Sequence, residues 1–157
     1  MIRNIPVIRE EKHDPYMLKE KYPDPSVCEV CNVVFTKGVY KWEKIIPKNA
    51  NKITCPVCKR IGDDFEGGSL ILEGNFLNKH KEEIMNLISN TAKLETEKHP
   101  LERIMEIKDI DNKVEVRTTY EHLTRRLGDA INKAYRGELK YNYSDDKYIR
   151  AWWKRDD

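Results

Sequence analysis

The four cysteines of this 157-residue chain form two identical pairs, and no cysteine is left over. Cys28 and Cys31 make the first pair, and Cys55 and Cys58 make the second, with two residues inside each pair. A two-residue spacer lets one tight turn direct both thiolates at the same ion, so two such turns supply four sulfur ligands. Zinc suits a tetrahedral four-sulfur site because it has no geometric preference of its own. A site with four protein ligands is closed, so the spacing predicts one structural Zn²⁺.

Three other interpretations of the cysteine pattern stay open on the sequence alone. Two intramolecular disulfides or four free thiols would use the same residues, and a rubredoxin-type iron centre has similar turns. The first six residues, Met-Ile-Arg-Asn-Ile-Pro, contain no apolar segment typical of a secretory signal. We therefore expect a cytoplasmic protein, in which paired cysteines indicate a metal more than disulfides.

The residues between the two pairs predict a β-hairpin. Residues 33–35 and 39–42 are short apolar runs joined by Thr36-Lys37-Gly38. A hairpin carried between two metal-binding turns is the plan of a zinc ribbon, which we expect over residues 26–62. Asn32 follows the first pair, where a left-handed backbone is often needed, and asparagine tolerates that conformation. Since about 40 residues build too small a core to fold alone, the metal would take the place of a core.

The segments that flank this ribbon predict an arm and a hinge. Residues 1–25 are polar and contain four prolines, so we expect an extended N-terminal arm. Residues 63–68 end in the pair Gly67-Gly68, which marks a break between domains. The second domain would then comprise residues 69–157.

Hydrophobic periodicity predicts a β-α-β-β-α-β-β order in that second domain. A strand at Leu70–Leu72 precedes a helix that is capped by Asn75 and runs to Glu97. Further strands are expected at 104–107, 114–116, 139–143 and 148–153. A second helix, with capping-box residues Thr118 and Glu121, should end at Gly137 and bury Leu123, Leu127, Ala130, Ile131 and Ala134. The predicted fold class is α+β, with both helices on one face of the sheet and the other face open.

Composition limits how the chain can bind its partners. No apolar run approaches the roughly 20 residues needed to cross a bilayer, so no membrane partner is expected. Residues 1–68 contain 12 basic and 10 acidic residues, and residues 69–157 contain 17 of each. A protein that binds by non-specific neutralisation of phosphates should be more basic, so an RNA contact would need a local patch. Glutamine is absent while Lys, Glu and Ile are abundant, a bias seen in proteins from hot environments.

Signs of catalysis are few. The chain contains no P-loop, G-x-G-x-x-G, H-E-x-x-H or G-x-S-x-G motif. The histidines share no ligand spacing: His80 and His122 fit helix faces, and His99 fits a helix end, where a cation complements the dipole. The Asp pairs at 63–64 and 145–146 fit turns better than a carboxylate dyad. We therefore predict no catalytic residues and no enzyme, with an uncharacterised hydrolase as the weaker alternative.

Basic residues gather in three places that suit RNA. In the last predicted strand Arg150, Trp152 and Lys154 alternate onto one face, while Ile149, Ala151 and Trp153 take the other. An aromatic ring among cations suits stacking on unpaired bases and pairing with phosphates. The second-ranked candidates are Arg125, Arg126, Lys133 and Arg136 on the second helix, and the third are Lys59 and Arg60. The plain alternatives are a solvated helix face and a strand whose tryptophan is partly buried.

Several motifs occur in an order that resembles a known family. They are V-C-E-V-C-N-V-V-F (27–35), G-V-Y-K-W (38–42), C-P-V-C-K-R-I-G-D (55–63), G-N-F-L-N-K-H-K-E-E-I-M-N-L-I-S-N (74–90), H-P-L-E-R-I (99–104) and T-T-Y-E-H-L-T-R-R-L-G-D-A-I (118–131). With them, residues 8–155 resemble a poorly characterised prokaryotic family of short zinc-ribbon proteins. More distantly, the ribbon and part of the α/β region are similar to the N-terminal part of the nonsense-mediated-decay-type adaptor that escorts the large ribosomal subunit in eukaryotes and has archaeal relatives.

The adaptor resemblance implies association with ribosomal RNA or a ribosomal subunit, the large subunit in particular. The four cysteines match its zinc-knuckle type residue by residue. The adaptor typically also has a second cysteine set, further β-rich domains and transport signals, none of which these residues contain, so export is not implied. We therefore expect a non-enzymatic zinc-binding protein that associates with structured RNA or the ribosome. The alternative is a protein-interaction or regulatory module that uses the ribbon and the C-terminal sheet face.

Overall fold

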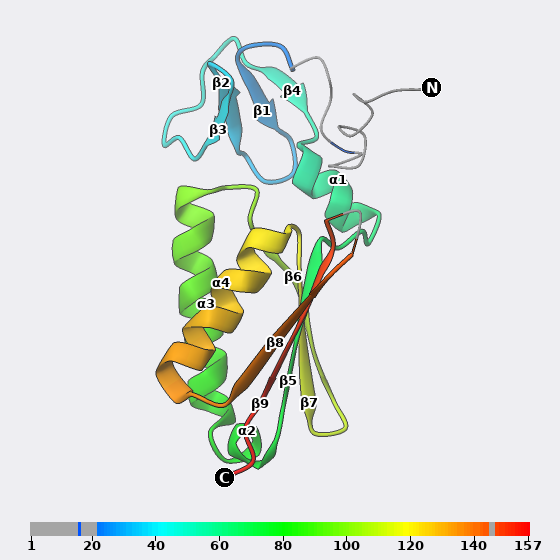
Figure 1. The fold of residues 1–157 in the computed structure, drawn as a ribbon. Coiled ribbons are helices and arrows are strands. Elements are labelled where there is room, and N and C mark those ends of the chain that lie inside the picture. Colours follow the sequence, from blue (N-terminus) through cyan, green and yellow to red (C-terminus); the bar gives the residue numbers. More distant parts are fainter. Residues whose placement is uncertain (1–15, 17–21, 145–146) are drawn as a thin grey trace, which may run out of the picture.

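The computed structural model describes Tyr16, residues 22–144 and residues 147–157. Two sheets and four helices make up this part of the chain (Figure 1), and the predicted α+β class is confirmed. Most of the predicted arm, and the Asp pair at 145–146 that fits a turn, lie outside the described residues. No helix in the described part of the chain is long and apolar enough to span a bilayer.

The cysteines belong to a small four-stranded sheet and the helix after it, which we call the cysteine module. Its elements are β1 (Ser26–Cys28), β2 (Val34–Thr36), β3 (Val39–Lys41), β4 (Asn51–Ile53) and α1 (Pro56–Gly62). The sheet order is β3-β2-β1-β4, with β1 and β4 parallel. The predicted hairpin is confirmed as β2 and β3, with Phe35 opposite Tyr40. Asn32 has the predicted left-handed backbone, at φ 70°.

The hairpin turn explains why β2 and β3 pair in this register. Lys37 and Gly38, the two residues between the strands, both have positive φ, at 52° and 82°. Two central residues of positive φ make the turn whose twist matches that of paired antiparallel strands, and glycine adopts that conformation without strain.

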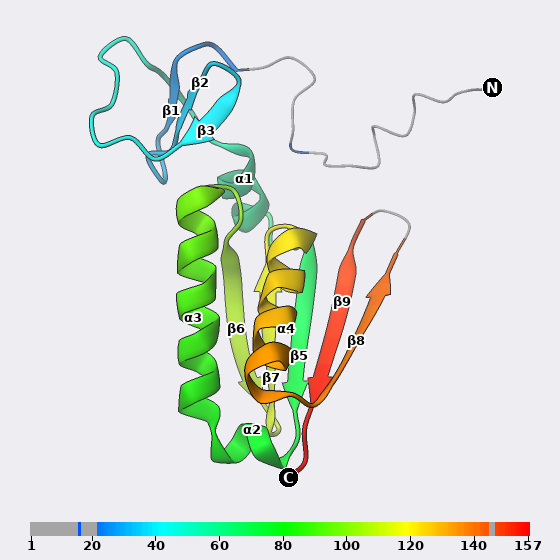
Figure 2. The same ribbon diagram turned by 60° about the vertical axis from the view of Figure 1, so that its left-hand side comes forward.

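The rest of the described chain forms a layered unit, which we call the α+β module. Its elements are β5 (Gly68–Glu73), α2 (Asn75–Lys79), α3 (Lys81–Lys98), β6 (Ile104–Ile110), β7 (Lys113–Thr118), α4 (Glu121–Tyr135), β8 (Glu138–Tyr143) and β9 (Ile149–Lys154). The strands lie in the order β6-β7-β5-β9-β8, and β5 pairs with β9 in parallel. Figure 2 shows α3 and α4 on the same face of this sheet. The core lies between these helices and the sheet and is rich in Leu, Ile and Val.

The structure differs from the sequence prediction at the first helix. We predicted one helix from Asn75, but the chain leaves the helical conformation at His80, which has φ −122° and separates α2 from α3. The His80 ring stacks on the Phe76 ring at a centroid distance of 4.2 Å. The cap is Gly74 at φ 110°, where a Cβ would lie 2.0 Å from the Arg155 carbonyl oxygen. Only glycine lets the chain turn there from β5 into α2.

The second helix also starts differently from the prediction. The capping box is wrong, because the Thr118 hydroxyl donates to the Tyr120 carbonyl at 2.8 Å instead of accepting from the helix. The Leu123 amide of α4 donates to the Glu102 carboxylate at 3.0 Å, so a distant side chain caps this helix. Ala134 is exposed instead of buried, because it lies in the last turn of α4, where the chain leaves for β8. Ala130 is half-buried.

Strand β9 has the side-chain alternation that the sequence predicts. Ile149, Ala151 and Trp153 are buried, and Trp153 is 0% exposed. The Trp153 indole N–H donates to the Arg136 carbonyl at 2.7 Å, which satisfies its one polar group. The intervening side chains, those of Arg150, Trp152 and Lys154, face away from the helices. Within the described part of the chain the sheet therefore has an open face, as expected.

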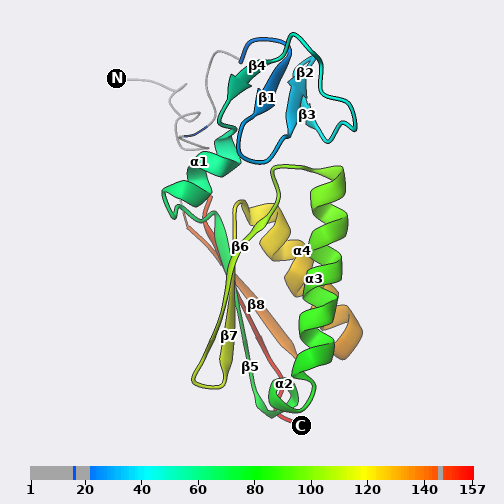
Figure 3. The same ribbon diagram turned by 180° about the vertical axis from the view of Figure 1, so that it is seen from behind.

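The two modules meet where α3 ends and β6 begins (Figures 1 and 3), far from the C-terminus. The Trp42 indole N–H donates to the Thr96 carbonyl across this junction at 2.9 Å. A Cβ at Gly67 would lie 2.4 Å from the Thr119 carbonyl oxygen, so this residue is closely packed against the α+β module. The division of the chain into domains at residues 63–68 stays a prediction.

Candidate metal centre and RNA-contact surface

Two local turns direct the cysteine sulfurs toward one another. The first turn joins β1 to β2, where the Val30 amide donates to the Cys28 sulfur at 3.4 Å. The second is the start of α1, where Cys55 is the N-cap and its sulfur accepts from the Cys58 amide at 3.4 Å. The Cys55 amide in turn donates to the Cys28 sulfur at 3.3 Å and ties the two turns together. Backbone N–H groups thus donate to the Cys28 and Cys55 sulfurs, and a hydrogen bond of this kind favours an anionic sulfur.

The four sulfurs have the spacing of a tetrahedral metal site. The Cys28 and Cys58 sulfurs lie 3.7 Å apart, and the Cys31 and Cys55 sulfurs lie 3.8 Å apart. Four sulfurs at about 2.3 Å from a central Zn²⁺ are separated by roughly 3.8 Å, so the set fits this ion. A disulfide needs sulfurs about 2.05 Å apart, and all four cysteines are free. Cys28, Cys31, Cys55 and Cys58 therefore form a site compatible with a structural zinc.

An arginine from the α+β module lies against this site. Arg103, between α3 and β6, donates from Nη2 to the Cys31 sulfur at 3.2 Å and from Nη1 to the Cys58 sulfur at 3.7 Å. Its Nε donates to the Pro100 carbonyl at 2.7 Å, and its guanidinium carbon lies 5.3 Å from the centre of the Trp42 ring. Four thiolates around a divalent cation carry a net charge of about −2, which a guanidinium partly offsets.

Protonation of the metal-free cluster reflects this environment. Hydrogen bonding to Cys55, and also to Arg103, lowers the pKa of Cys31 to about 4. Burial raises the pKa of Cys58 to about 11, and the contact with Cys31 raises that of Cys55. The pKa of Arg103 is raised: burial alone would lower it, but the hydrogen bond to Cys31 and the negative charge of that sulfur have the larger combined effect. Cys31 is therefore a thiolate at neutral pH, held beside a permanent cation.

The sequence did not predict the role of Arg103. It lies 45 residues after Cys58 and 72 after Cys31, so no local spacing connects it to the pairs. The sequence did contain one indication of Arg103: it lies in the motif His99-Pro100-Leu101-Glu102-Arg103-Ile104, one of the motifs on which the family resemblance rests. That motif had no assigned role.

Comparisons with known proteins returned nothing. No protein-family model matches this chain, and no curated protein or solved structure matches it. The resemblance to short zinc-ribbon proteins and to the ribosomal export adaptor therefore stays a hypothesis.

The first-ranked RNA candidates lie together on the open face of the sheet. Arg150 and Lys154 are exposed and Trp152 is half-buried. In the register of the sheet, Trp152 lies between Ile71 of β5 and Lys140 of β8. A shallow depression surrounds the indole and is lined by Glu73, Glu138, Lys140, Trp152 and Lys154. The depression thus carries charges of both signs around one ring.

The second-ranked candidates lie elsewhere. Arg125, Arg126, Lys133 and Arg136 are exposed on α4 or at its end, on the opposite face of the sheet from Trp152. Arg126 is also paired, since its Nε lies 3.1 Å from the Glu95 carboxylate. The structure therefore does not bring these arginines together with the β9 residues.

The third-ranked candidates are held inside the cysteine module. Lys59 is half-buried and donates to the Tyr22 hydroxyl at 3.4 Å. Arg60 is 3% exposed, donates to the Thr119 carbonyl at 3.0 Å and lies 4.3 Å from the centre of the Tyr120 ring. Arg60 thus fastens α1 to the α+β module, and its burial leaves little of its cation exposed for the predicted RNA contact.

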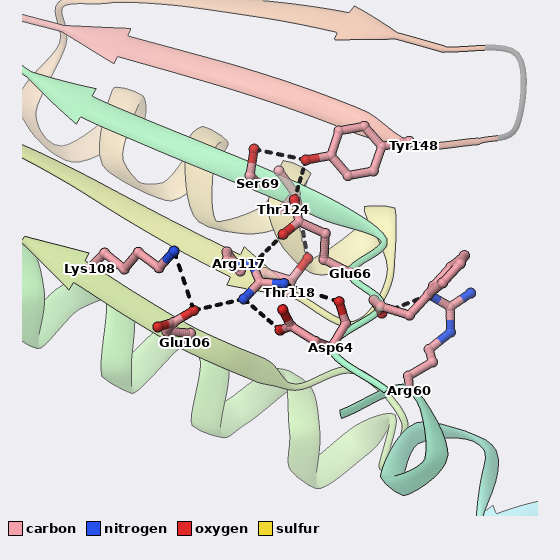
Figure 4. A network of polar contacts seen from close by, with 11 residues as sticks. Arg60, Asp64, Glu66, Ser69, Glu106, Lys108, Arg117, Thr118, Thr124 and Tyr148 are labelled. Atoms are coloured by element: carbon pink, nitrogen blue, oxygen red, sulfur yellow. Dashed lines mark hydrogen bonds and ion pairs between the residues drawn. The ribbon is translucent and has the colours of Figure 1, made fainter. Parts of the chain in front are cut away.

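One side of the open face carries an ion-pair network that the sequence did not predict (Figure 4). Arg117 of β7 is 8% exposed and pairs with Asp64 at 2.8 Å, Glu106 at 2.7 Å and Glu66. The Tyr148 hydroxyl also donates to Glu66. These acidic residues neutralise Arg117, so we do not expect it to contact an anionic ligand.

Proposed function

We propose that the protein is a zinc-stabilised, non-enzymatic RNA-binding protein of the cytoplasm that associates with structured RNA of the ribosome, the large subunit being favoured. The observation that carries this proposal is Trp152, a half-buried indole on the open sheet face with Lys140 and Lys154 beside it. The large subunit enters through the adaptor resemblance alone.

The zinc part of the proposal rests on the geometry of the four sulfurs. Their separations of 3.7 and 3.8 Å match a tetrahedron of Zn–S bonds. Metal analysis of protein purified without added metal should give about one equivalent of zinc per chain. A red iron chromophore, or less than about half an equivalent of zinc, would contradict it. Cys28→Ser should unfold the cysteine module and leave the secondary structure of the α+β module largely intact.

The RNA part rests on how the open face presents its aromatic ring. Trp152 cannot turn toward the core, because Trp153 and Ala151 occupy that side of β9. Glu73 and Glu138 also line the depression, so the surface is not uniformly basic and would bind a duplex backbone weakly. A ring beside a few cations instead favours unpaired bases, with the base stacked on the indole and the neighbouring phosphates near Lys140, Arg150 and Lys154.

A binding titration with matched variants tests this surface. Labelled single-stranded oligouridylate is titrated with the protein, and binding is followed by fluorescence anisotropy. Stacking is worth about 1–3 kcal/mol per base, so Trp152→Ala should weaken binding by about tenfold or more. Tyr143→Ala is the control, because Tyr143 is an exposed aromatic of β8 that lies on the other side-chain face of that strand. Normal binding by a folded Trp152→Ala protein would refute the proposed contact.

The salt dependence of binding separates the two basic surfaces. Each phosphate contact contributes a slope of about 0.7 in the logarithm of the affinity against the logarithm of salt for single strands. Arg150→Met should lower the slope by about one contact, whereas Arg125→Met, on α4, should leave it unchanged. The opposite result would move the RNA contact to the helical face.

A second candidate function, binding of a protein partner, is favoured by the loop between β3 and β4. Ile45 is 85% exposed there, and Ile46, Trp42 and Val39 are also exposed apolar residues of the cysteine module. Exposed apolar residues that form one patch can mark a protein–protein contact. If this loop binds a protein partner, Ile45→Ser should weaken that binding, and the binding itself should depend little on salt. The same substitution should leave oligouridylate binding unchanged.

A further inference from the structure

A second group of metal-binding side chains lies where α3 ends and α4 begins. Glu95 and His99 are four residues apart at the C-terminal end of α3, and His122 lies in the first turn of α4. One ligand atom from each lies within 4.8 Å of the other two. Among the described residues, this trio and the four cysteines are the groups of three or more such side chains that come this close.

The trio places one buried carboxylate near two imidazoles and in contact with one of them. Glu95 is 7% exposed, and its Oε1 lies 3.1 Å from the His122 Nε2. Its Oε2 accepts from the Arg126 Nε at 3.1 Å, which fixes the carboxylate and leaves Oε1 on the histidine side. The rings of His99 and His122 lie 5.9 Å apart and nearly perpendicular, at 80°. Carboxylates that bind metals are commonly held in this way by a second hydrogen bond from the protein.

The electrostatic surroundings favour a cation at this position. The Glu102 carboxylate lies beside the trio, and its pKa is raised, mainly because the group is buried. The charges of Glu95 and Glu121 also raise this pKa, whereas the charge of His122 acts to lower it. Glu95, Glu102 and Glu121 thus place several carboxylates around two histidines, with Arg126 as the paired cation. A divalent ion between the imidazoles would interact favourably with all of these carboxylates.

We propose that Glu95, His99 and His122 bind a divalent transition-metal ion, such as Zn²⁺, in an open surface site separate from the four cysteines. Two imidazoles and one carboxylate are the donors that zinc, nickel and copper accept. His99 and His122 are exposed, so water would complete the coordination, in contrast to the closed cysteine site. The ion would replace the His122–Glu95 hydrogen bond and join the end of α3 to the start of α4. That place adjoins the Trp42–Thr96 contact between the modules.

Calorimetric titration tests this site on the full chain with its cysteine site already filled. Added Zn²⁺ should bind as one further equivalent. Loss of a partner behind the ligands typically weakens metal binding about 10–100-fold, so His122→Ala, which removes a ligand, should cost more than about 100-fold. His99→Ala should do the same. His80→Ala is the matched control: His80 lies at the other end of α3, bonds to Glu83 at 2.9 Å and belongs to neither ligand group among the described residues.

Two results would overturn the proposal. One is the absence of a further equivalent up to about 1 mM Zn²⁺, a concentration at which even weak sites fill. The other is an affinity that stays the same in His99→Ala and His122→Ala. If either variant fails to fold, imidazole NMR of the wild-type protein decides: Zn²⁺ should shift the ring signals of His99 and His122 and leave those of His80 in place, and unshifted rings would refute the site.

Discussion

Replacement of Arg103 by methionine tests how the α+β module supports the cysteine site. Arg103→Met keeps a long unbranched side chain but removes the guanidinium that donates to Cys31 at 3.2 Å and to Cys58 at 3.7 Å. The four sulfurs and their own turns stay intact, since these turns are held by backbone N–H groups. The expected effect is weaker zinc binding without loss of the tetrahedral ligand set.

The size of the effect follows from the two contacts. A hydrogen bond from a charged donor contributes about 1.5–3 kcal/mol, and the 3.2 Å contact to Cys31 is the stronger of the two. One decade in affinity corresponds to about 1.4 kcal/mol, so the loss should be about 10–100-fold. The same range is typical when a partner behind a metal ligand is removed. The contact at 3.7 Å adds little.

Competition with a chromophoric zinc chelator measures this affinity, and circular dichroism checks that each variant is folded. Arg103→Lys should fall between the wild type and Arg103→Met, because a lysine restores the charge but not the forked donors. Arg125→Met is the matched control, since Arg125 is an exposed arginine of α4 with no part in the cysteine site. Wild-type zinc affinity in a folded Arg103→Met protein would refute the claim that this guanidinium stabilises the site.

Three further substitutions test the fold by chemical denaturation. Trp153→Ala should lower the free energy of unfolding by about 3–5 kcal/mol, because its ring is 0% exposed; a loss below 1 kcal/mol would mean that the faces of β9 are reversed. Gly67→Ala should lower the free energy of unfolding by about 1–3 kcal/mol, because the added Cβ would lie 2.4 Å from the Thr119 carbonyl oxygen. Gly62→Ala is the control and should leave the free energy of unfolding unchanged, because its Cβ would have no atom within 4 Å. Equal effects of the two substitutions would contradict the close packing at Gly67. Arg117→Met should lower the free energy of unfolding by about 2 kcal/mol or more, because Glu66 loses its ion-pair partner. An unchanged denaturation midpoint would show that the ion-pair network does not stabilise the fold.

Features encoded by local spacing could be predicted from the sequence. The two residues inside each cysteine pair place the sulfurs in adjacent turns, and the described sulfur separations agree with that prediction. The left-handed Asn32 and the hairpin of β2 and β3 depend on a few neighbouring residues. The alternation in β9 depends on the two-residue period of a strand, which places Trp153 in the core.

Features that depend on distant contacts could not be predicted. The break at His80, whose ring stacks on Phe76, was not predicted, because the sequence around it shows continuous helical periodicity. The cap of α4 comes from Glu102, which lies in the loop between α3 and β6 and not in the local capping box. Arg60 looked like a surface cation beside a cysteine, but tertiary packing encloses it.

The surroundings of the cysteine site and the proposed second metal site could not be predicted from the sequence either. Arg103 reaches the cysteine sulfurs from the other module, and no spacing in the sequence connects them. The trio of Glu95, His99 and His122 comes from two helices, so the histidines share no ligand spacing along the chain. Such groups become visible only when the packing of α3 against α4 is known.

The most direct test of the proposed function is to map where RNA touches the protein. Ultraviolet cross-linking of wild-type protein to single-stranded oligouridylate, followed by mass spectrometry of the linked peptides, locates the contact without any substitution. We expect cross-links in β9, with Trp152 as the principal residue and Lys140 of β8 nearby in the register of the sheet. Cross-links confined to α4 or to the cysteine module would contradict it.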